Sequence, residues 1–599
     1  MRIFLDGEER QTDNITVLEL LKKEGKDFYR PDGIEEISYI NNDQCPLVNI
    51  AEIDGGIYPA NVLKNKAVKE GMDIRTSSPL VKERLQQRIS LLSKNHECFL
   101  IRKAQEFVAC EADSAQLVDL EERKTWRFET RVSEPSVVHD PNKCIRCGSC
   151  VETCREQSVE ALRMDEKEGV IIDESKCVRC GQCVLNCPFG YVEKYMNLLT
   201  DWLGCGLCAF SRPVGAFSER DDVAKVINAL KDPDKYVVIE IAPSIRSTIG
   251  EEFGAKPGTV VTRKLYAALR EIGFDRIWDT NFSADLTIME EGYELIGRVK
   301  DNGVLPQFTS CCPGWIKFCE TYYPELIPHL SSAKSPQQMF GAIAKTYAAQ
   351  ELNIDPDKMF VVSVMPCTAK KYERDREEFM DAYEYWKEKE RIMDKFPDVD
   401  VVLSTRECAK LIKMFNLDLL GMPEQEADSM LGEYTGAAPI FGRTGGVMTA
   451  ALRTAYEVIE GKPLEDIELE ALGRYEGIKT ASIPTGVGEI KIAVTSGLSN
   501  ARLICEDIKK GGEFSKYHFI EIMTCPGGCV GGGGQIVTPV LAKKLARAAG
   551  LNEDDRNCPI RKSHENPDIK ELYNDFLDEP CGELSHHLLH THYVRRDGR

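Results

Sequence analysis

Two cysteine runs of identical spacing constrain this chain more than any other feature. CIRCGSCVETC (Cys144–Cys154) and CVRCGQCVLNCP (Cys177–Pro188) both follow C-x2-C-x2-C-x3-C. In such a run three thiolates converge on one iron–sulfur cubane, and the fourth cysteine ligates the neighbouring cluster. The spacing predicts two 4Fe-4S clusters, one on Cys144, Cys147, Cys150 and Cys187 and one on Cys177, Cys180, Cys183 and Cys154. The alternative is zinc, but a structural zinc site takes four ligands arranged as two pairs.

The bulk composition describes a large globular protein. Its 599 residues allow three to five domains, and 42% hydrophobic residues can form real cores. A net charge of −21 argues against a nucleic-acid partner, because phosphate backbones require basic surfaces. The start MRIFLDGEERQ lacks a secretory signal pattern and no long apolar run follows, so we expect a cytoplasmic protein without a membrane span. In such a chain the 23 cysteines indicate metal ligands.

The hydrophobic pattern predicts several α/β units. Residues 1–80 begin as strand, turn, strand and helix, and residues 81–125 show helical spacing in VKERLQQRISLLSKN. From residue 218 onward, strands such as YVVIEIAP, MFVVSVMP and IKIAVTSG alternate with helices, which favours parallel sheets with helical crossovers. Ligands of open α/β sheets bind beyond the carboxyl ends of the strands. The sequence VMPC places a cysteine at such an end.

Three further loops carry cysteines: TSCCPGW, MPCTAKK and EIMTCPGGCVGGGGQ. Cys311 and Cys312 are adjacent, and adjacent cysteines rarely form a disulfide without backbone strain. In an extended segment neighbouring side chains point to opposite faces. We therefore expect them to differ in role, for example one metal ligand and one free reactive thiol. The alternative is a pair of buried small apolar side chains. The glycine run in the third loop allows the backbone to approach a bulky ligand closely.

The cysteine runs resemble bacterial two-cluster ferredoxins, and the three loops resemble the three signature motifs of iron-iron (FeFe) hydrogenases, in the family's order. The segments RKSHENPDIKELYNDFL and HLLHTHY are also similar to that family, so the resemblance covers roughly residues 126–599. It implies reversible conversion of protons and electrons to H2 at an H-cluster. This cofactor is a 4Fe-4S cubane joined by one thiolate to a two-iron unit with CO, cyanide and azadithiolate. The implied cubane ligands are Cys312, Cys367, Cys525 and Cys529, with Cys529 as the bridge.

The resemblance also implies a proton path. Cys311 resembles the thiol that exchanges protons with the azadithiolate amine. Glu291, Glu294 and Arg298 lie at i, i+3 and i+7, on one face of a helix, and together with Ser331 they resemble the family's route to the surface. From spacing alone, a solvated charged helix face is the favoured interpretation, and the family match reverses that preference.

Seven other residues are implied to contact the cofactor. Lys370 matches a lysine that hydrogen-bonds one cyanide, Pro243 and Ser244 match a contact to the other, and Met365 matches a thioether near the bridging carbonyl. On base rates alone, Met365 and Phe441 are more often simple core residues. The remaining implied cavity or cofactor contacts are Gln337, Phe441 and Met523.

The N-terminal region departs from the pattern of larger family members. Residues 1–80 resemble their ubiquitin-like domain, but only Cys45 remains of its four ligands, so we expect no 2Fe-2S cluster. His96 is followed by Cys98 and Cys110 at the wrong spacing for a His/Cys3 cluster. Cys205 and Cys208 indicate either a vestigial third cysteine run or a site completed by distant ligands such as Cys98 and Cys110.

The prediction is a multidomain α/β and α+β protein. We expect a ubiquitin-like domain (1–80), a degenerate helical segment (81–125), a two-cluster ferredoxin-like domain (126–217) and an FeFe-hydrogenase domain (218–599) with two parallel or mixed sheets flanked by helices.

The expected partners are a ferredoxin or a redox partner subunit in a hetero-oligomer, and maturation proteins. Use of NAD(P)H would need another chain, because no dinucleotide-binding motif is evident. The alternative functions are an H2 or redox sensor with low turnover, and an iron–sulfur assembly scaffold. Cys311 and the intact loops disfavour both.

Overall fold

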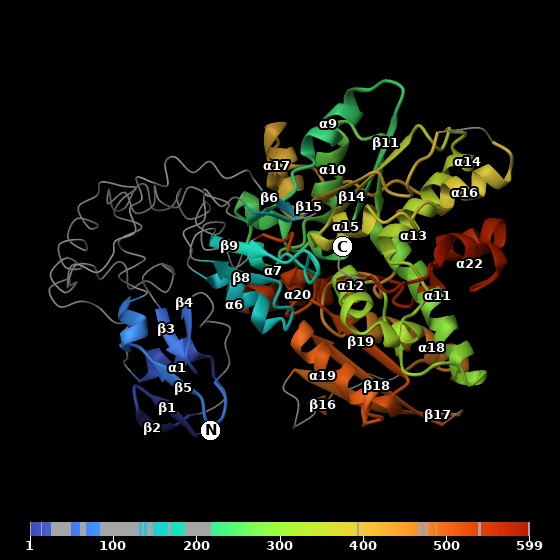
Figure 1. Cartoon of the computed structure of the whole chain (residues 1–599). Coiled ribbons are helices and arrows are strands. Elements are labelled where there is room, and N and C mark those ends of the chain that lie inside the picture. Colours follow the sequence, from blue (N-terminus) through green and yellow to red (C-terminus); the bar gives the residue numbers. More distant parts are fainter. Residues whose placement is uncertain are drawn as a thin grey trace.

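The computed structural model in Figure 1 describes residues 2–12, 15–24, 50–59, 68–83, 131–133, 137–139, 148–165, 169–185, 217–391, 394–464, 470–471, 477–486, 488–536 and 541–596. Several cysteines that carry predictions lie outside the described residues: Cys45, Cys98, Cys110, Cys144, Cys147, Cys187, Cys205 and Cys208.

The N-terminal unit is a five-stranded sheet in the order β2-β1-β5-β3-β4. Ile3 and Leu5 of β1 are buried while Phe4 between them is exposed, so one face of the sheet packs against α1 and the other meets water. The predicted strand, turn, strand and helix are present. The elements are β1 (Arg2–Leu5), β2 (Glu8–Gln11), α1 (Val17–Lys23), β3 (Ile50–Ile53), β4 (Gly56–Pro59) and β5 (Asp73–Arg75).

The region of the two cysteine runs is built from short elements. The hairpin β8 (Leu162–Asp165) and β9 (Gly169–Ile172) follows α6 (Ser149–Glu156) and precedes α7 (Gln182–Leu185). A separate sheet has the order β10-β7-β6, so β10 (Phe217–Glu219) pairs with a segment that precedes the first cysteine run. The expected domain boundary at 217/218 therefore falls within a strand. The other two strands are β6 (Arg131–Ser133) and β7 (Val137–His139).

The larger part of the molecule contains two sheets. The first is fully parallel, in the order β12-β11-β14-β15, and its strands are almost entirely buried, as their continuous apolar runs predict. Helices connect these strands, which confirms the predicted crossovers. The elements are α9 (Val223–Lys231), β11 (Tyr236–Ile241), α10 (Thr262–Ile272), β12 (Arg276–Asp279), β14 (Met359–Met365), β15 (Val401–Ser404) and α17 (Thr405–Met414).

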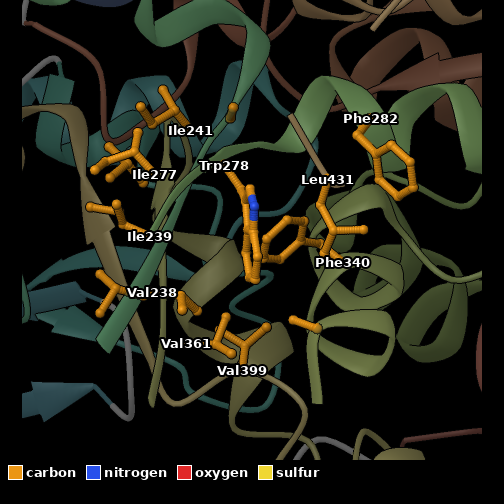
Figure 2. Close-up of a cluster of buried hydrophobic side chains, with 14 of the residues drawn as sticks. Val238, Ile239, Ile241, Ile277, Trp278, Phe282, Phe340, Val361, Val399 and Leu431 are labelled. Atoms are coloured by element: carbon orange, nitrogen blue, oxygen red, sulfur yellow. The ribbon is translucent and has the colours of Figure 1, made fainter. Parts of the chain in front are cut away.

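Figure 2 shows the core beside this sheet. The Trp278 indole meets the ring of Phe340 edge-on, with centroids 5.9 Å apart, next to Val361 and Val399. Such aromatic pairs contribute about 0.5–1.5 kcal/mol beyond their buried area. This dense packing fixes the strands whose ends carry the predicted site.

The second sheet is mixed, in the order β13-β19-β18-β17-β16. Strands β13, β19 and β18 run parallel, while β17 and β16 are antiparallel additions. Its elements and the helices that pack around it are β13 (Gln307–Phe308), α12 (Pro313–Tyr322), α18 (Gly446–Glu460), β16 (Glu470–Ala471), β17 (Ile478–Thr485), β18 (Gly488–Ser496), α19 (Leu498–Lys509) and β19 (Phe519–Met523).

Helix α11 (Thr280–Lys300) packs against α13 (Pro336–Ile343) on one side and α18 on the other. Its first thirteen residues are all buried, including Glu290 and Glu291, so its carboxylates lie in the interior. The chain then continues through α20 (Leu541–Asn557), α21 (Pro567–Leu572), a π-helical turn (Tyr573–Leu577) and α22 (Glu583–Leu589). Within the described residues, no helix has both the length and the apolar character needed to cross a membrane.

Candidate active site

The predicted site residues meet beyond the carboxyl ends of four parallel strands. Strand β11 leads to Pro243 and Ser244, β13 leads to Cys311 and Cys312, and the other two lead to the remaining cysteine loops. Parallel strands place their following loops at the same edge, which is the usual ligand position in α/β sheets. The third strand, β14, ends at Met365 before Cys367, and β19 ends at Met523 before Cys525 and Cys529.

The structure brings the four cysteines of these loops together. The charges of Cys312 and Cys367 act on both Cys525 and Cys529, which requires the thiols to be close neighbours. Burial is the main cause that raises the pKa of the Cys367, Cys525 and Cys529 thiols, to about 12 for Cys367. The thiol of Cys312 also lies 3.3 Å from the Thr524 hydroxyl, and the Thr524 N–H points at the same sulfur at 3.4 Å.

This donor set fits a cubane better than a single ion. In the described part of the chain, no three cysteine sulfurs lie within 4.8 Å of one another. A tetrahedral zinc ion with bonds of about 2.3 Å would draw its sulfurs closer than that, whereas a four-iron cluster holds them further apart. Four soft thiolates from three loops are also the donors that iron–sulfur clusters take.

Polar side chains from several loops lie around the cysteines. Ser244 in the 3-10 turn η3 (Pro243–Ile245) accepts a hydrogen bond from Gln535 Nε2 at 3.0 Å. The Gln337 side chain donates to Lys370 O at 3.3 Å, while its buried Oε1 has no partner among the described protein groups. An unsatisfied buried acceptor is costly unless a ligand pairs with it, so this atom supports a bound polar group.

Lys370 is a buried cation of the site. Burial opposes its charge, but the Glu373 carboxylate at 2.8 Å outweighs burial and holds the pKa of Lys370 above its ordinary value. Cys311 and Cys367 act on the same ammonium group, so a positive charge faces the cysteine loops. A fixed cation of this kind can pair with an anionic ligand.

Apolar side chains close the remaining sides. Phe441, in the 3-10 turn η8 (Pro439–Gly442), and Met523 belong to one core cluster, and Cys311 packs against its edge. Met365 is buried in the cluster built around the parallel sheet. These contacts serve as core packing and also keep water from the cysteine loops.

The residues predicted for a proton path lie near one another, although Glu291 Oε2 has no hydrogen-bond partner among the described protein groups. Burial and then the charge of Glu291 raise the pKa of the Cys311 thiol, which keeps it protonated. Burial, followed by the charge of Glu294, raises the pKa of Glu291 to about 8, and Ser331 opposes part of that rise. Ser331 Oγ donates to Glu294 Oε2 at 2.6 Å, and Arg298 donates to Glu294 Oε1 at 2.7 Å. Each member is therefore a neighbour of the next.

A second group of four cysteines lies around a separate cavity. Ala161 N–H donates to Cys154 Sγ at 3.2 Å, a contact that suits a thiolate ligand. Burial raises the pKa of Cys154 to about 11 and also raises that of Cys177 and Cys180. Cys150 is buried nearby in α6, and its predicted co-ligands are not described. The cysteines that line the cavity are Cys154, Cys177, Cys180 and Cys183, the predicted second ligand set.

The two groups of cysteines are in contact through side chains and backbone. Gln182 Nε2 donates to Cys525 Sγ at 3.2 Å. A Cβ added to Gly533 would lie 2.6 Å from Cys180 O, so only glycine allows the two loops to approach this closely. A continuous path for electrons between the two sites needs this kind of close approach.

Sequence reasoning missed several residues of the site. Gln182 lies inside the second cysteine run, where only the cysteines carried a signal. Glu373 lies just beyond the MPCTAKK motif, and Thr524 and Gln535 lie inside the EIMTCPGGCVGGGGQ loop, Thr524 directly before a predicted ligand. Their positions next to the motifs were the one available clue.

The fold and site are those of an iron–sulfur redox protein, in which cysteine loops that follow strands of two sheets contact the region of the two cysteine runs. Three family models match: "Iron only hydrogenase large subunit, C-terminal domain" over residues 235–533, "Iron hydrogenase small subunit" over 542–596, and "4Fe-4S dicluster domain" over 137–198.

Similar proteins agree with these matches. The chain is 40% identical to the NADP-reducing hydrogenase subunit HndD of Solidesulfovibrio fructosivorans, across 94% of this chain and 93% of the relative. It is 37% identical to iron hydrogenase 1 of Clostridium pasteurianum, across 99% and 100%. A solved structure of the HydA1 hydrogenase of Chlamydomonas reinhardtii matches with a TM-score of 0.56 and 39% identity, over 63% of this chain and 99% of that one.

The chain therefore belongs to the FeFe hydrogenase family. Its activity is the oxidation and production of H2, with electrons relayed through iron–sulfur clusters.

Proposed function

We propose that Cys312, Cys367, Cys525 and Cys529 hold the cubane of the H-cluster, with Cys529 as the bridging thiolate. The observation that carries this proposal is the convergence of these four thiols at the carboxyl ends of strands from both sheets. When bound, the two-iron unit supplies the site at which H2 is split or formed. Lys370 and Ser244 would orient its anionic ligands, with Pro243 beside them, and Met365, Gln337, Phe441 and Met523 would line its cavity.

The proton route is proposed to run from Cys311 through Glu291, Ser331 and Glu294 to the surface, with Arg298 holding Glu294. Its support is geometric, because each group neighbours the next. Glu291, with a pKa of about 8, is mostly protonated at neutral pH and can donate to Ser331 while Ser331 donates to Glu294. A relay through an otherwise dry interior requires such a chain of donors and acceptors.

The electron route is proposed to enter at the dicluster domain. One cluster would use Cys154, Cys177, Cys180 and Cys183, and the other Cys150 with Cys144, Cys147 and Cys187. The contact of Gln182 with Cys525 supports direct transfer from the first of these to the H-cluster cubane.

For the remaining regions we propose the domain assignments that the sequence predicts. A five-stranded sheet with a helix on one face supports a ubiquitin-like domain at residues 1–80, for which we propose a docking role without a 2Fe-2S cluster. Residues 81–125 would be a degenerate cluster segment, 126–217 the dicluster domain and 218–599 the hydrogenase domain.

We also propose that a ferredoxin or a partner subunit exchanges electrons with this chain, in the cytoplasm. The similarity to a subunit of an NADP-reducing hydrogenase, across nearly the full length of both chains, supports a hetero-oligomer in which another chain uses the nucleotide.

The ligand assignment is tested by replacing each of the four cysteines with serine in anaerobically matured protein. We expect each variant to lose about four iron atoms per chain or more, because a cubane holds four irons, and to lose H2 evolution. Cys408→Ala is the matched control, since Cys408 is buried in α17 outside the site and should retain both. Retention of full iron and activity in Cys367→Ser would contradict the assignment.

A further inference from the structure

A second set of hydrogen-bonded side chains reaches Glu294 from the C-terminal arm. His590 directly follows α22, is buried, and forms a β-bridge with Ala333 that holds it beside the Ser331–Ala333 segment. Its Nδ1 lies 2.8 Å from Ser332 Oγ, and its Nε2 lies 2.8 Å from Glu290 Oε2. The imidazole therefore connects two groups that the proton route does not include.

The surroundings of Glu290 determine which ring nitrogen of His590 titrates. The Glu290 side chain is fully buried and accepts hydrogen bonds from the Tyr573 hydroxyl and, at 2.8 Å, from the Cys581 N–H. A carboxylate held by such donors acts as an acceptor, so His590 Nε2 carries a proton toward it in both charge states. The nitrogen that gains or loses a proton is then Nδ1, which faces Ser332.

The Ser332 hydroxyl has one proton and two acceptors within reach. Glu294 Oε1 lies 3.3 Å from Ser332 Oγ, and His590 Nδ1 lies on the other side. When Nδ1 is protonated it donates to Ser332 Oγ, so the hydroxyl proton turns to Glu294. When Nδ1 is bare, the hydroxyl donates to it, and Glu294 loses this one donor while keeping those from Ser331, Arg298 and the Ser332 backbone N–H.

We propose that His590 is a positioning residue whose protonation decides whether the Ser332 hydroxyl, in addition to the Ser332 backbone N–H, donates a hydrogen bond to Glu294. This inference rests on the proposed function, in which Glu294 is the carboxylate of the proton route nearest to the surface. At low pH the additional donor favours the ionised carboxylate, so Glu294 passes its proton onward. At high pH the donor is withdrawn and Glu294 keeps a proton more readily.

Several charged and titratable groups lie around the imidazole, and their charges affect the pH at which it takes up a proton. Helix α11 contributes Glu290 and Glu294, and the C-terminal arm contributes Tyr573 and Cys581. The exposed His586 of α22 stacks on His590 with ring centroids 4.5 Å apart, and burial followed by the charge of His590 lowers its pKa. The buried ammonium group of Lys334, next to the β-bridge, is paired with the carboxylates of Asp398, at 3.0 Å, and Asp381.

The first test follows the carboxyl infrared band of Glu294 against pH in the holoenzyme, with Glu294→Gln identifying the band. His590→Phe, which removes both ring nitrogens, and Ser332→Ala should each raise the pH at which Glu294 takes up a proton by about 0.5–1 unit, the size of one hydrogen bond. Ser332→Thr keeps the hydroxyl and should behave as the wild type. His587→Phe, in the helix that directly precedes His590, is the matched control and should leave the band unchanged.

The second test asks whether the two residues act as one unit. The pH–rate profile of H2 evolution should change in the same way in His590→Phe and Ser332→Ala, and the double variant should match the single ones. The inference would be overturned if the effects of the two substitutions on the rate multiplied in the double variant. It would also be overturned if the pH midpoint of the Glu294 carboxyl band were unchanged in both single variants. Full activity in Glu294→Gln would instead refute the proposed proton route, and the infrared midpoints would still decide whether His590 controls Ser332.

Discussion

Gln182 Nε2 donates a hydrogen bond to Cys525 Sγ at 3.2 Å and to Gly531 O at 3.3 Å. The side chain lies between two proposed ligands of one cluster, Cys180 and Cys183, and contacts a proposed ligand of another. This contact ties the redox properties of the H-cluster cubane to the fold of the dicluster domain.

Replacing Gln182 with leucine should lower the reduction potential of the H-cluster cubane. A hydrogen bond to a ligating sulfur stabilises the more negative reduced cluster, and one such bond contributes about 0.5–1.5 kcal/mol. For a one-electron couple this corresponds to a decrease of roughly 20–60 mV. Infrared or EPR redox titration measures this midpoint potential. The potential of Gln182→Asn should fall between those of the wild type and the leucine variant. An unchanged midpoint in the leucine variant would show that the contact does not tune the cluster.

A methyl group at Gly533 should separate the two cluster loops. Its Cβ would lie 2.6 Å from Cys180 O and 2.8 Å from the Gly181 Cα, so the backbones must move apart. We expect Gly533→Ala to slow H2-driven viologen reduction at least tenfold. Gly297→Ala, on helix α11 with open space around its Cβ, is the control and should be unaffected. Equal rates in both variants would contradict a close junction.

Removing the proposed proton donors should block turnover without loss of the cofactor. Cys311→Ser and Glu291→Gln are expected to lower H2 evolution by about 10²–10⁴-fold, the usual contribution of a positioned acid or base. The CO and cyanide infrared bands should remain, which separates a blocked relay from a lost cluster. Wild-type rates in Glu291→Gln would refute the route.

The buried Glu240 gives a prediction for stability against pH. Burial is the main cause that raises its pKa from 4.5 to about 8, despite hydrogen bonds from Thr280 and Ser363. Such a carboxyl binds more protons in the folded state, so its contribution to stability is lost as pH rises from about 4.5 to about 8.

Glu240→Gln removes that titration. The apparent melting temperature of the variant should therefore increase relative to the wild type between pH 5.5 and pH 8, because each unit of pKa shift corresponds to about 1.4 kcal/mol. If the melting temperatures of the two proteins differ by the same amount at pH 5.5 and at pH 8, the raised pKa of Glu240 is contradicted.

The sequence predicted those parts of the molecule that local pattern determines. Continuous apolar runs marked β11 and β14 correctly, and cysteine spacing selected a ligand set of which Cys154, Cys177, Cys180 and Cys183 line one cavity. The three cysteine loops identified the positions that the structure brings together.

Long-range partnerships could not be predicted in the same way. Gln182 and Cys525 are 343 residues apart, and Ser332 and His590 are 258 residues apart. Neither glutamine nor histidine carries a local signal for such a contact, because it arises only when separate elements pack. The burial of Glu291 likewise depends on α11 lying between two other helices, which its charged sequence disfavours.

The central claim is a hydrogenase whose clusters are one H-cluster and two ferredoxin-type cubanes. The most direct test measures iron per chain and viologen-linked H2 evolution on the same anaerobic, fully matured sample. We predict about fourteen irons, since each cubane holds four and the two-iron unit adds two, together with rapid H2 evolution. Near eighteen irons would mean a further cluster, on cysteines such as Cys98, Cys110, Cys205 and Cys208. About fourteen irons with almost no H2 would contradict the catalytic role and favour a sensor.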